Sequence, residues 1–193
     1  MRSIIYILFS FIIFASFMIT VMGVDQNVKT VSHQVTIEKN AQEAIVELVK
    51  LFNHDFTKIG YKKSAPKFKP GWLDSTRITW YCDFDNNDQT DSVTYYLDEN
   101  TIDRLQNPNI RYLYRKINND QALRIGVGVI FFKLSYYDSA LNPISYSKLS
   151  DVDNINKIKA IKIQLRVESQ YNIQNKYGST YWEKIYFPKN LNF

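Results

Sequence analysis

The run IIYILFSFIIFASFMITVMGVDQNVKTVSHQVTIEKNAQEAIVELVKLFNHDFTKIG, residues 4–60, decides the fold. It contains no proline, and its only glycines are Gly23 and Gly60. After Gly23 the apolar residues recur at intervals of three and four, which is the spacing of one face of an α-helix. We therefore predict a helix that begins in the apolar segment and continues to Ile59, with Gly60 as its C-cap residue.

The first part of this run is apolar enough to cross a membrane. Residues 4–22 carry no charge, and a helix of that length spans roughly 28 Å, close to the thickness of the bilayer hydrocarbon core. Arg2 precedes the segment, so the positive-inside tendency places the N-terminus in the cytoplasm. We expect a single-pass cytoplasmic (inner) membrane protein that contacts lipid through residues 4–22, with its C-terminal domain in the periplasm or outside the cell.

A cleaved signal peptide is the alternative interpretation of the same segment. Val21 and Gly23 are small residues of the kind that precede a cleavage site. The apolar run is longer than the roughly 7–15 residues that are typical of a signal peptide, which favours an anchor that stays attached. Both interpretations export residues 24–193.

Two apolar faces follow one another along the predicted helix, and the change falls near Ile37 and Glu38. The first face is a narrow stripe of four valines, Val24, Val28, Val31 and Val35. The second is wider, is turned by roughly 100°, and consists of Ile37, Ala41, Ala44, Ile45, Leu48, Leu51, Phe52, Phe56 and Ile59. We expect the second face to pack on the protein's own sheet and the first to meet lipid or helices of neighbouring subunits. Two separate helices with a break near residues 36–39 are the alternative.

The remainder of the chain predicts strands. Runs rich in β-branched and aromatic residues alternate with clusters of turn residues. The predicted strands are 76–83, 92–98, 110–117, 128–137, 157–168 and 180–187, and 142–156 is predicted as a polar loop. A long helix followed by consecutive antiparallel strands predicts the α+β class, with the helix packed on one face of an antiparallel sheet. We divide the chain into an anchor (1–23), an amphipathic helix (24–60) and an antiparallel β-rich globular domain (61–193).

Charge and composition narrow the functional classes. The 193 residues carry a formal net charge of +5 that is scattered along the chain, so we expect no nucleic-acid binding. Cys82 is the only cysteine, which excludes an intramolecular disulfide and favours a buried thiol on a strand. His33 and His54 are the only histidines, about 31 Å apart along the predicted helix. With no catalytic motif and no phosphate-binding loop, we expect a protein that is not an enzyme and has no certain cofactor.

The acidic segment DFDNNDQTD, residues 83–91, is the candidate metal site. Its oxygen-bearing side chains occupy alternate positions, as the ligands of a calcium loop do. The candidate ligands are Asp83, Asp85, Asn87 and Asp91, with Gln89 at position seven and Asp98 as a late donor. Asp88 stands where such loops have glycine, and Thr94 stands where they have a bidentate glutamate. A solvated hairpin tip, rich in Asp and Asn because those residues favour turns, is the alternative.

Aromatic residues and the helix end supply further candidates. Trp72, Trp80 and Trp182, together with the many tyrosines, allow a ligand-binding face, although core and sheet packing is the simpler expectation. Asp55 and Tyr61 are expected to hold the end of the helix against the sheet.

Several short phrases resemble those of type IV pilins and type II secretion pseudopilins, most of all minor pseudopilins of the J type and PilW-like minor pilins. The phrases are FNHDFTKIGY (52–61), DFDNNDQTDSVTYYL (83–97), IFFKLSYYD (130–138), residues 158–167 and IYFPKNL (185–191). The resemblance implies a minor subunit of a type II secretion or type IV pilus machine, which assembles through its N-terminal helix with other pilin-like subunits and inner-membrane assembly proteins. Its β-domain would bind neighbouring minor subunits or cargo.

The chain departs from the family pattern at its start. Family members have a basic leader, a Gly-Phe-Thr-Leu-like processing site and a glutamate at the fifth mature position, whereas the first glutamate here is Glu38. A tip or initiator subunit, a relative that stays in the membrane and a different start site are the interpretations of this departure. An unrelated membrane-anchored extracytoplasmic binding module, a sensor or an adhesin, is the alternative function.

Overall fold

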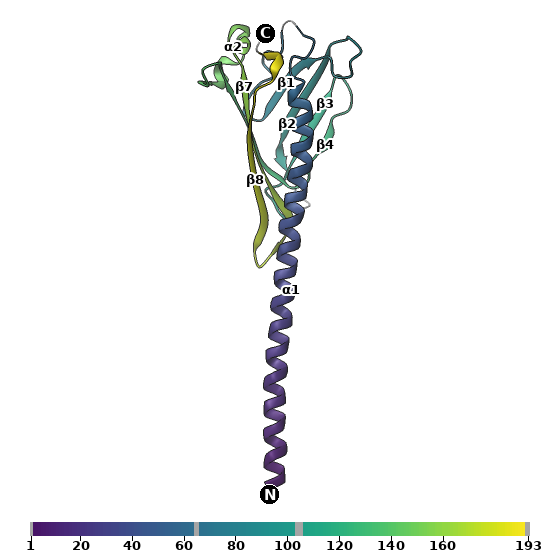
Figure 1. Cartoon of the computed structure of the whole chain (residues 1–193), viewed down its shortest axis with the longest axis vertical. Coiled ribbons are helices and arrows are strands. Elements are labelled where there is room, and N and C mark those ends of the chain that lie inside the picture. Colours follow the sequence, from purple (N-terminus) through teal and green to yellow (C-terminus); the bar gives the residue numbers. More distant parts are fainter. Residues whose placement is uncertain (1, 64–65, 103–105, 192–193) are drawn as a thin grey trace.

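The computed structural model describes residues 2–63, 66–102 and 106–191. It begins with one unbroken helix, α1 (Arg2–Thr57), which confirms the single-helix prediction over the two-helix alternative (Figure 1). Gly60 lies beyond the end of α1 in the left-handed region, with φ 71°. Its N–H donates to the carbonyl oxygen of Tyr81 at 3.1 Å, so Gly60 turns the chain toward the sheet and does not cap the helix.

Two four-stranded antiparallel sheets follow α1, and together they confirm the α+β class. The first, sheet A, has the order β1-β2-β3-β4. Its strands are β1 (Arg77–Cys82), β2 (Asp91–Thr101), β3 (Arg111–Ile117) and β4 (Leu123–Ile125). The second, sheet B, has the order β6-β5-β7-β8. Its strands are β5 (Val129–Tyr137), β6 (Pro143–Ile144), β7 (Ala160–Ile173) and β8 (Lys176–Tyr186).

The region predicted as a polar loop, 142–156, holds short regular elements. They are β6, the 3-10 helix η1 (Tyr146–Lys148) and the helix α2 (Val152–Asn156), and a further 3-10 helix, η2 (Lys189–Leu191), follows β8. The Asp151 side chain caps α2 by accepting from the N–H of Asp153. Ile155 is the buried residue of α2, so this short turn closes one end of the core.

The second face of α1 packs on the β-domain, as the sequence predicts. Ala41, Ile45, Leu48, Phe52 and Phe56 are all at most 5% exposed. Figure 1 shows the upper part of α1 lying against the sheets while its lower part extends away from them. The valine stripe precedes the buried residues, and its four members are 57–61% exposed.

Phe52 and Phe56 join α1 to both sheets. Phe56 lies 5.0 Å from the Trp80 ring of β1, and Phe52 lies 5.9 Å from the Phe132 ring of β5, measured between centroids. Tyr95 stacks on Trp80 at 5.7 Å with an interplanar angle of 6°. Such aromatic pairs contribute about 0.5–1.5 kcal/mol each beyond the burial of their area. Because Phe52 and Phe56 contact rings of both sheets, the end of the helix lies at the centre of the core.

The hairpin β7–β8 is longer than the sequence predicts and runs beside α1. Its turn is formed by Gln174 and Asn175, whose φ angles are 51° and 61°, the left-handed pair of a type I′ two-residue hairpin turn. Near this turn the backbone of Gly178 touches the helix backbone. A Cβ built on Gly178 would lie 2.9 Å from the Glu38 nitrogen and from the Ile37 carbonyl atoms. The helix and the hairpin therefore meet near Ile37 and Glu38, where the apolar face of the helix changes direction in the sequence.

Asp55 joins α1 to sheet A through hydrogen bonds, which confirms its expected structural role. Its fully buried carboxylate accepts from the Tyr95 hydroxyl and from the Arg115 Nε, both at 2.6 Å. Burial and the Asp55 charge raise the pKa of Tyr95 well above its usual range. Burial lowers the pKa of Arg115, but the hydrogen bond to Asp55 outweighs that effect and the net shift is upward. The tyrosine stays neutral and the arginine charged.

Candidate functional site

The largest uncovered apolar surface lies on the free part of α1. Large side chains along residues 4–35 are exposed, with Tyr6 and Ile19 at 72%. Exposed apolar surface of this extent marks an interaction with a membrane or with protein partners. Nothing in the described part of the β-domain covers it.

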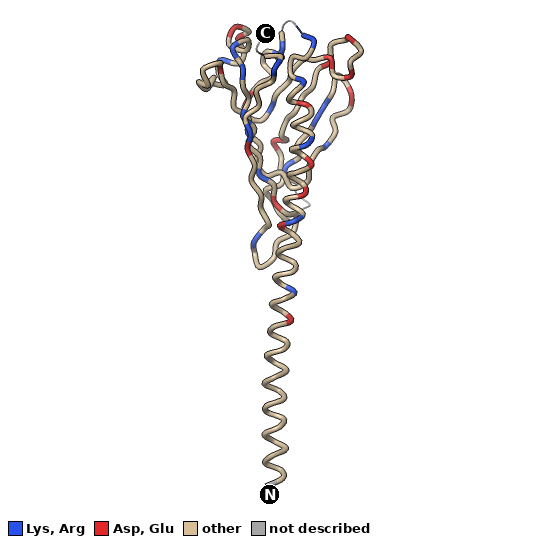
Figure 2. The backbone as a smooth tube through the Cα atoms, in the orientation of Figure 1, with Lys and Arg blue, Asp and Glu red and all other residues tan. Residues whose placement is uncertain are grey.

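No charged residue lies between Arg2, with which α1 begins, and Asp25. Figure 2 shows the lower half of α1 without acidic or basic residues until Asp25 and Lys29, which form an exposed ion pair at 2.6 Å. This one helix near the N-terminus is long and apolar enough to cross a membrane. Its 56 residues extend about 84 Å, whereas a bilayer core needs only about 30 Å. A segment of helix that includes the valine stripe is therefore left between such a membrane and the β-domain.

A groove of about 410 Å³ lies where α1 meets the outer end of β7. Its apolar lining comes from the helix, from β7 and from the loop before β5, and consists of Ile37, Ala41, Ala44, Val127, Val167 and Tyr171. Three carboxylates also line it, those of Glu43, Glu47 and Glu168. The groove lies directly after the exposed part of α1, between the helix and the β-domain. Its three carboxylates make it acidic.

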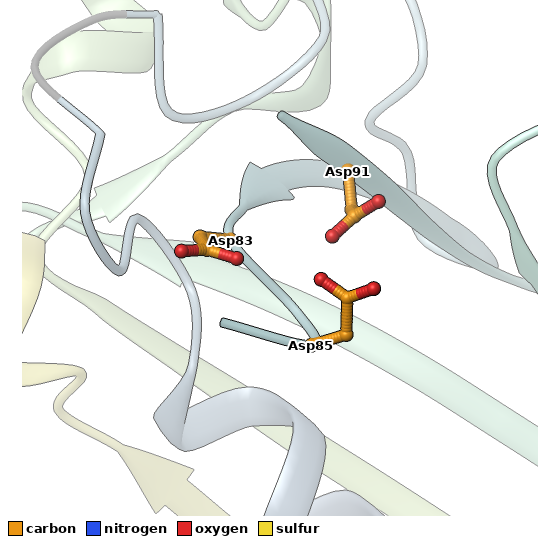
Figure 3. Close-up of side chains that lie close together, drawn as sticks. All are labelled: Asp83, Asp85 and Asp91. Carbon is orange, nitrogen blue, oxygen red and sulfur yellow. The ribbon is translucent and has the colours of Figure 1, made fainter. Parts of the chain in front are cut away.

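The candidate metal residues converge in the loop between β1 and β2. Asp83, Asp85 and Asp91 place ligand oxygens within 4.8 Å of one another (Figure 3). Asp83 and Asp91 are buried, at 2% and 7% exposure, and Asp85 is exposed. Three of the four candidate ligands therefore lie together, and calcium binding by them stays a prediction.

Backbone groups and one lysine already bind these carboxylates. Asp83 accepts from the N–H groups of Asn87 and Asp88 at 3.0 and 3.1 Å. The Lys62 ammonium bridges Asp83 and Asp88 at 2.9 and 2.6 Å. These two side-chain hydrogen bonds raise the pKa of Lys62. Burial raises the pKa of Asp83, but Lys62 and the loop N–H groups outweigh it and the net shift is downward.

The loop backbone has the conformation of a calcium loop at one key position. Asp88 occupies the place of the usual glycine, and its φ is 63°, so aspartate adopts the left-handed form that glycine takes easily. The Asn87 side chain bonds to Asp85 at 3.0 Å, and Gln89 donates its N–H to Asn87 at 2.8 Å. Asp98 lies on β2, seven residues after Asp91 and away from this cluster. Its carboxylate accepts a hydrogen bond from the N–H of Asn100.

Two partners of the loop come from distant parts of the sequence. Lys62 reaches it from the segment after α1, and Asn118 donates to Asp91 at 2.7 Å from the end of β3. Neither lies near residues 83–91 in sequence, so no short-range pattern pointed to them. Lys62 belongs to a segment that also contains Lys63, Lys67 and Lys69, and nothing in that run distinguishes it as the partner of the acidic loop.

The three tryptophans divide between core and surface. Trp80 is fully buried, and Trp182 stacks on Phe52 with ring centroids 6.3 Å apart. Both therefore take the packing role. Trp72 is 41% exposed and lies under the Lys69 ammonium, which is 4.1 Å from its ring centroid. Trp72 is the member of the set that faces solvent in a cationic environment.

Comparison with known proteins gives no match: no protein-family model, no curated protein and no solved structure matches this chain. Its overall form, a long apolar N-terminal helix packed on antiparallel sheet, is pilin-like in shape.

Proposed function

We propose that the protein is a non-enzymatic, minor pilin-like or pseudopilin-like subunit of a type II secretion or type IV pilus machine. The observation that carries this proposal is the continuity of α1. One helix contains the apolar segment, the exposed valine stripe and the face that is buried in the β-domain. A subunit that assembles through its helix needs all three in one rigid element.

Physical chemistry supports a helical partner for the valine stripe. Lipid can cover about 20 residues of a helix, and the stripe begins just after that length. Val24, Val28, Val31 and Val35 repeat at four, three and four residues, which is the spacing of a helix–helix seam. The flanking residues Asp25 and Lys29 are charged, so this stretch suits a seam in water better than a lipid contact.

In this proposal the N-terminus lies in the cytoplasm and the β-domain lies outside the inner membrane. Residues 4–22 hold the subunit in lipid before assembly, where inner-membrane assembly proteins reach it. The β-domain then contacts neighbouring minor subunits or cargo, and the acidic groove beside β7 offers a surface for that contact.

An anchored sensor or adhesin is the competing function. Such a module needs only an anchor and a link to its binding domain. A flexible linker between the two would serve it, whereas α1 runs without a break from the apolar segment into the core. That continuity favours the assembling subunit.

Cysteine cross-linking of the full chain in its native membranes tests the proposal. Val28→Cys and Val31→Cys place a thiol on the stripe, and Gln26→Cys places a matched thiol on the opposite side of the helix. Cys82 is fully buried and does not compete. We expect the stripe variants to form adducts joined helix to helix with other single-helix proteins, identified by mass spectrometry, and the Gln26 variant to form few.

Two results would contradict the proposal. One is equal cross-linking from both sides of the helix, which indicates random contact in the membrane. The other is an absence of helix-to-helix adducts from the stripe variants in cells where the β-domain binds a ligand or receptor, which is the result expected of an anchored sensor or adhesin.

A further inference from the structure

The outer face of sheet A is hollowed around two short side chains. Residues of β1 and β2 alternate between the core and the outside, and Thr79 and Thr94 point outward from directly paired positions. They are nevertheless only 2% and 8% exposed, and their hydroxyls lie 2.9 Å apart. Longer neighbours stand around them, and the result is a pocket of about 410 Å³ with a hydroxyl floor.

One wall of this pocket is aromatic and cationic. Trp72 contributes its ring, with the Lys69 ammonium 4.1 Å and the Arg77 guanidinium carbon 5.2 Å from the ring centroid. Arg77 pairs with Asp74 at 3.1 Å through one terminal nitrogen. Its Nε is buried and has no hydrogen-bond partner among the described residues, and the side chain lines the pocket, so Asp74 leaves the hydrogen-bonding capacity of this guanidinium only partly used.

The opposite wall adds a third cation. Lys116 of β3 is paired in register with Thr94 and lines the same pocket. Lys69 and Lys116 form no ion pair within the part of the chain that the structure describes. None of the described lining residues is acidic. Three positive charges therefore surround the two hydroxyls, with only the Asp74 carboxylate beside one of them.

The chemistry of this pocket matches one kind of ligand. A flat indole ring packs against the apolar face of a sugar ring, hydroxyl groups donate to and accept from its hydroxyls, and arginine and lysine bind carboxylate or phosphate oxygens. The volume lies within the range of small-ligand sites, about 300–1,000 Å³. We propose that this pocket, which we call the sheet A pocket, binds a sugar unit that carries a carboxylate or a phosphate.

Acidic peptides fit this position less well. Extended peptides gain affinity by hydrogen bonding to a free sheet edge. The sheet A pocket lies on the face of β1 and β2, whose backbone groups are already paired with each other. Only side chains are available here, and hydroxyl groups form the floor.

Single-stranded nucleic acid also fits less well. Such sites track several phosphates along a basic groove with successive stacking platforms. The sheet A pocket is a single open hollow, in which Trp72 is the aromatic ring beside the cations and Tyr96 is stacked on Tyr114, which suits one ring and one anionic group.

Titration calorimetry on the full chain in detergent tests the proposal. The probes are a galacturonic acid trisaccharide, galactose 6-phosphate, the neutral galactose trisaccharide, triglutamate and a trinucleotide of thymidine. We expect one or both acidic sugars to bind with a Kd of about 1 mM or tighter, a free energy near −4 kcal/mol, and the other three probes to bind at least about tenfold more weakly. The first two probes distinguish a carboxylate from a phosphate preference.

Variants locate the binding. Trp72→Ala and Lys116→Gln should each weaken acidic-sugar binding by about tenfold or more, while the matched controls Tyr171→Ala and Lys176→Gln, which alter an exposed aromatic and an exposed lysine elsewhere, should not. Thermal melting verifies that every variant is folded. The proposal is overturned if the acidic sugars fail to bind the folded chain at 10 mM (about tenfold above the expected Kd). It is also overturned if triglutamate or the trinucleotide binds as tightly as they do, or if the pocket variants bind like the controls.

Discussion

At the residue scale, Asp55 is the charge on which the attachment of the helix end depends. Its carboxylate is fully buried and binds Tyr95 and Arg115 from two strands of sheet A. The Arg115 side chain is itself only 13% exposed. Loss of either charge leaves the other with little water around it, and an unpaired buried charge is among the most costly defects in a folded protein.

We therefore expect Asp55→Asn to destabilise the folded domain by about 3–5 kcal/mol. Denaturant unfolding of the full chain in detergent, followed by tryptophan fluorescence, measures this change. Asp25→Asn is the matched control, because it breaks the exposed ion pair with Lys29 and should cost less than about 1 kcal/mol. Equal effects of the two variants would show that Asp55 does not hold the helix end.

Cys82 gives a pH-dependent prediction. Burial is the main cause that raises the pKa of its thiol to about 12, and the folded side chain is fully buried. The folded state holds the proton more tightly than the unfolded state, so this contribution to stability is present below about pH 8.5 and is lost as pH rises toward 12. At pH 8 we expect iodoacetamide to leave the folded chain unmodified and to alkylate Cys82 in denaturant. Rapid alkylation of the folded chain would contradict the burial of Cys82.

Calcium binding by the acidic loop stays a prediction, and Lys62 supplies its sharpest test. The lysine ammonium occupies the position of a cation between Asp83 and Asp88 and should compete with a metal. We expect calcium to raise the melting temperature only near millimolar concentration, in the range of weak extracellular sites, about 0.1–1 mM. Lys62→Gln should shift that response to lower calcium, and Asp85→Asn should abolish it. An unchanged melting temperature for both the native chain and Lys62→Gln at 10 mM calcium (about tenfold above that range) would leave only a solvated turn.

At the scale of elements, the contact between β8 and α1 depends on Gly178. Its missing side chain lets the hairpin backbone approach the helix backbone at Ile37 and Glu38. Both surfaces at this contact are main chain and cannot rotate away as a side chain does. A methyl group here has no space unless the hairpin lifts from the helix.

Gly178→Ala should therefore cost about 1–3 kcal/mol, the usual penalty for an overpacked site. Hydrogen exchange should increase at the β7–β8 turn before it increases elsewhere, because the turn lies beside the clash. Gly23→Ala is the control: nothing lies within 4 Å of the added carbon, so domain stability should not fall. A Gly178 variant with native exchange at this turn would contradict the close packing.

Elements with strong local patterns were predictable, and those that depend on tertiary contacts were not. Helix α1 and the strands β1, β2, β3 and β5 follow from apolar spacing and from β-branched and aromatic runs. The three-residue β4 and two-residue β6 are too short to carry a pattern, and they exist because neighbouring strands offer partners. The early start of β8 was missed since polar residues dominate 176–180, although the Gln174–Asn175 turn was a local signal for it.

The candidate sites show the same division. Alternate spacing in the sequence was enough to indicate Asp83, Asp85 and Asp91, which lie together in the fold. The sheet A pocket combines residues from a loop and from three separate strands, so no single stretch of sequence described it. The sequence makes Trp72 a candidate together with Trp80 and Trp182, and only its exposure in the fold distinguishes it from Trp80.

At the scale of the whole molecule, the β-domain and the free helix are separable. The buried residues of α1 begin at Ala41, the β7–β8 hairpin contacts the helix at Ile37 and Glu38, and Figure 1 shows the helix below the hairpin extending away from both sheets. The domain therefore contains the helix contacts on which its own stability depends.

Removal of residues 1–35 should give a water-soluble monomer whose melting temperature is within a few degrees of the full chain. Removal of residues 1–46 also takes Ala41 and Ile45 from the core and should cost about 2–5 kcal/mol, the loss typical of a deleted large apolar side chain. Light scattering and thermal melting measure the two outcomes. Aggregation of the first truncated chain would show that the free helix contributes to the fold.

The unbroken helix also has a geometric consequence. Gly178 fixes the β-domain to the helix near residue 37. The length of the helical stretch from 24 to 36 therefore sets the height of the domain above a membrane and its heading, the direction in which it faces around the helix axis. Seven residues inserted there would raise the domain by about 10 Å and change its heading by only about 20°. Two inserted residues would raise it by about 3 Å yet turn it through about 200°. If neighbouring subunits recognise the heading, the shorter insertion is the one that prevents assembly.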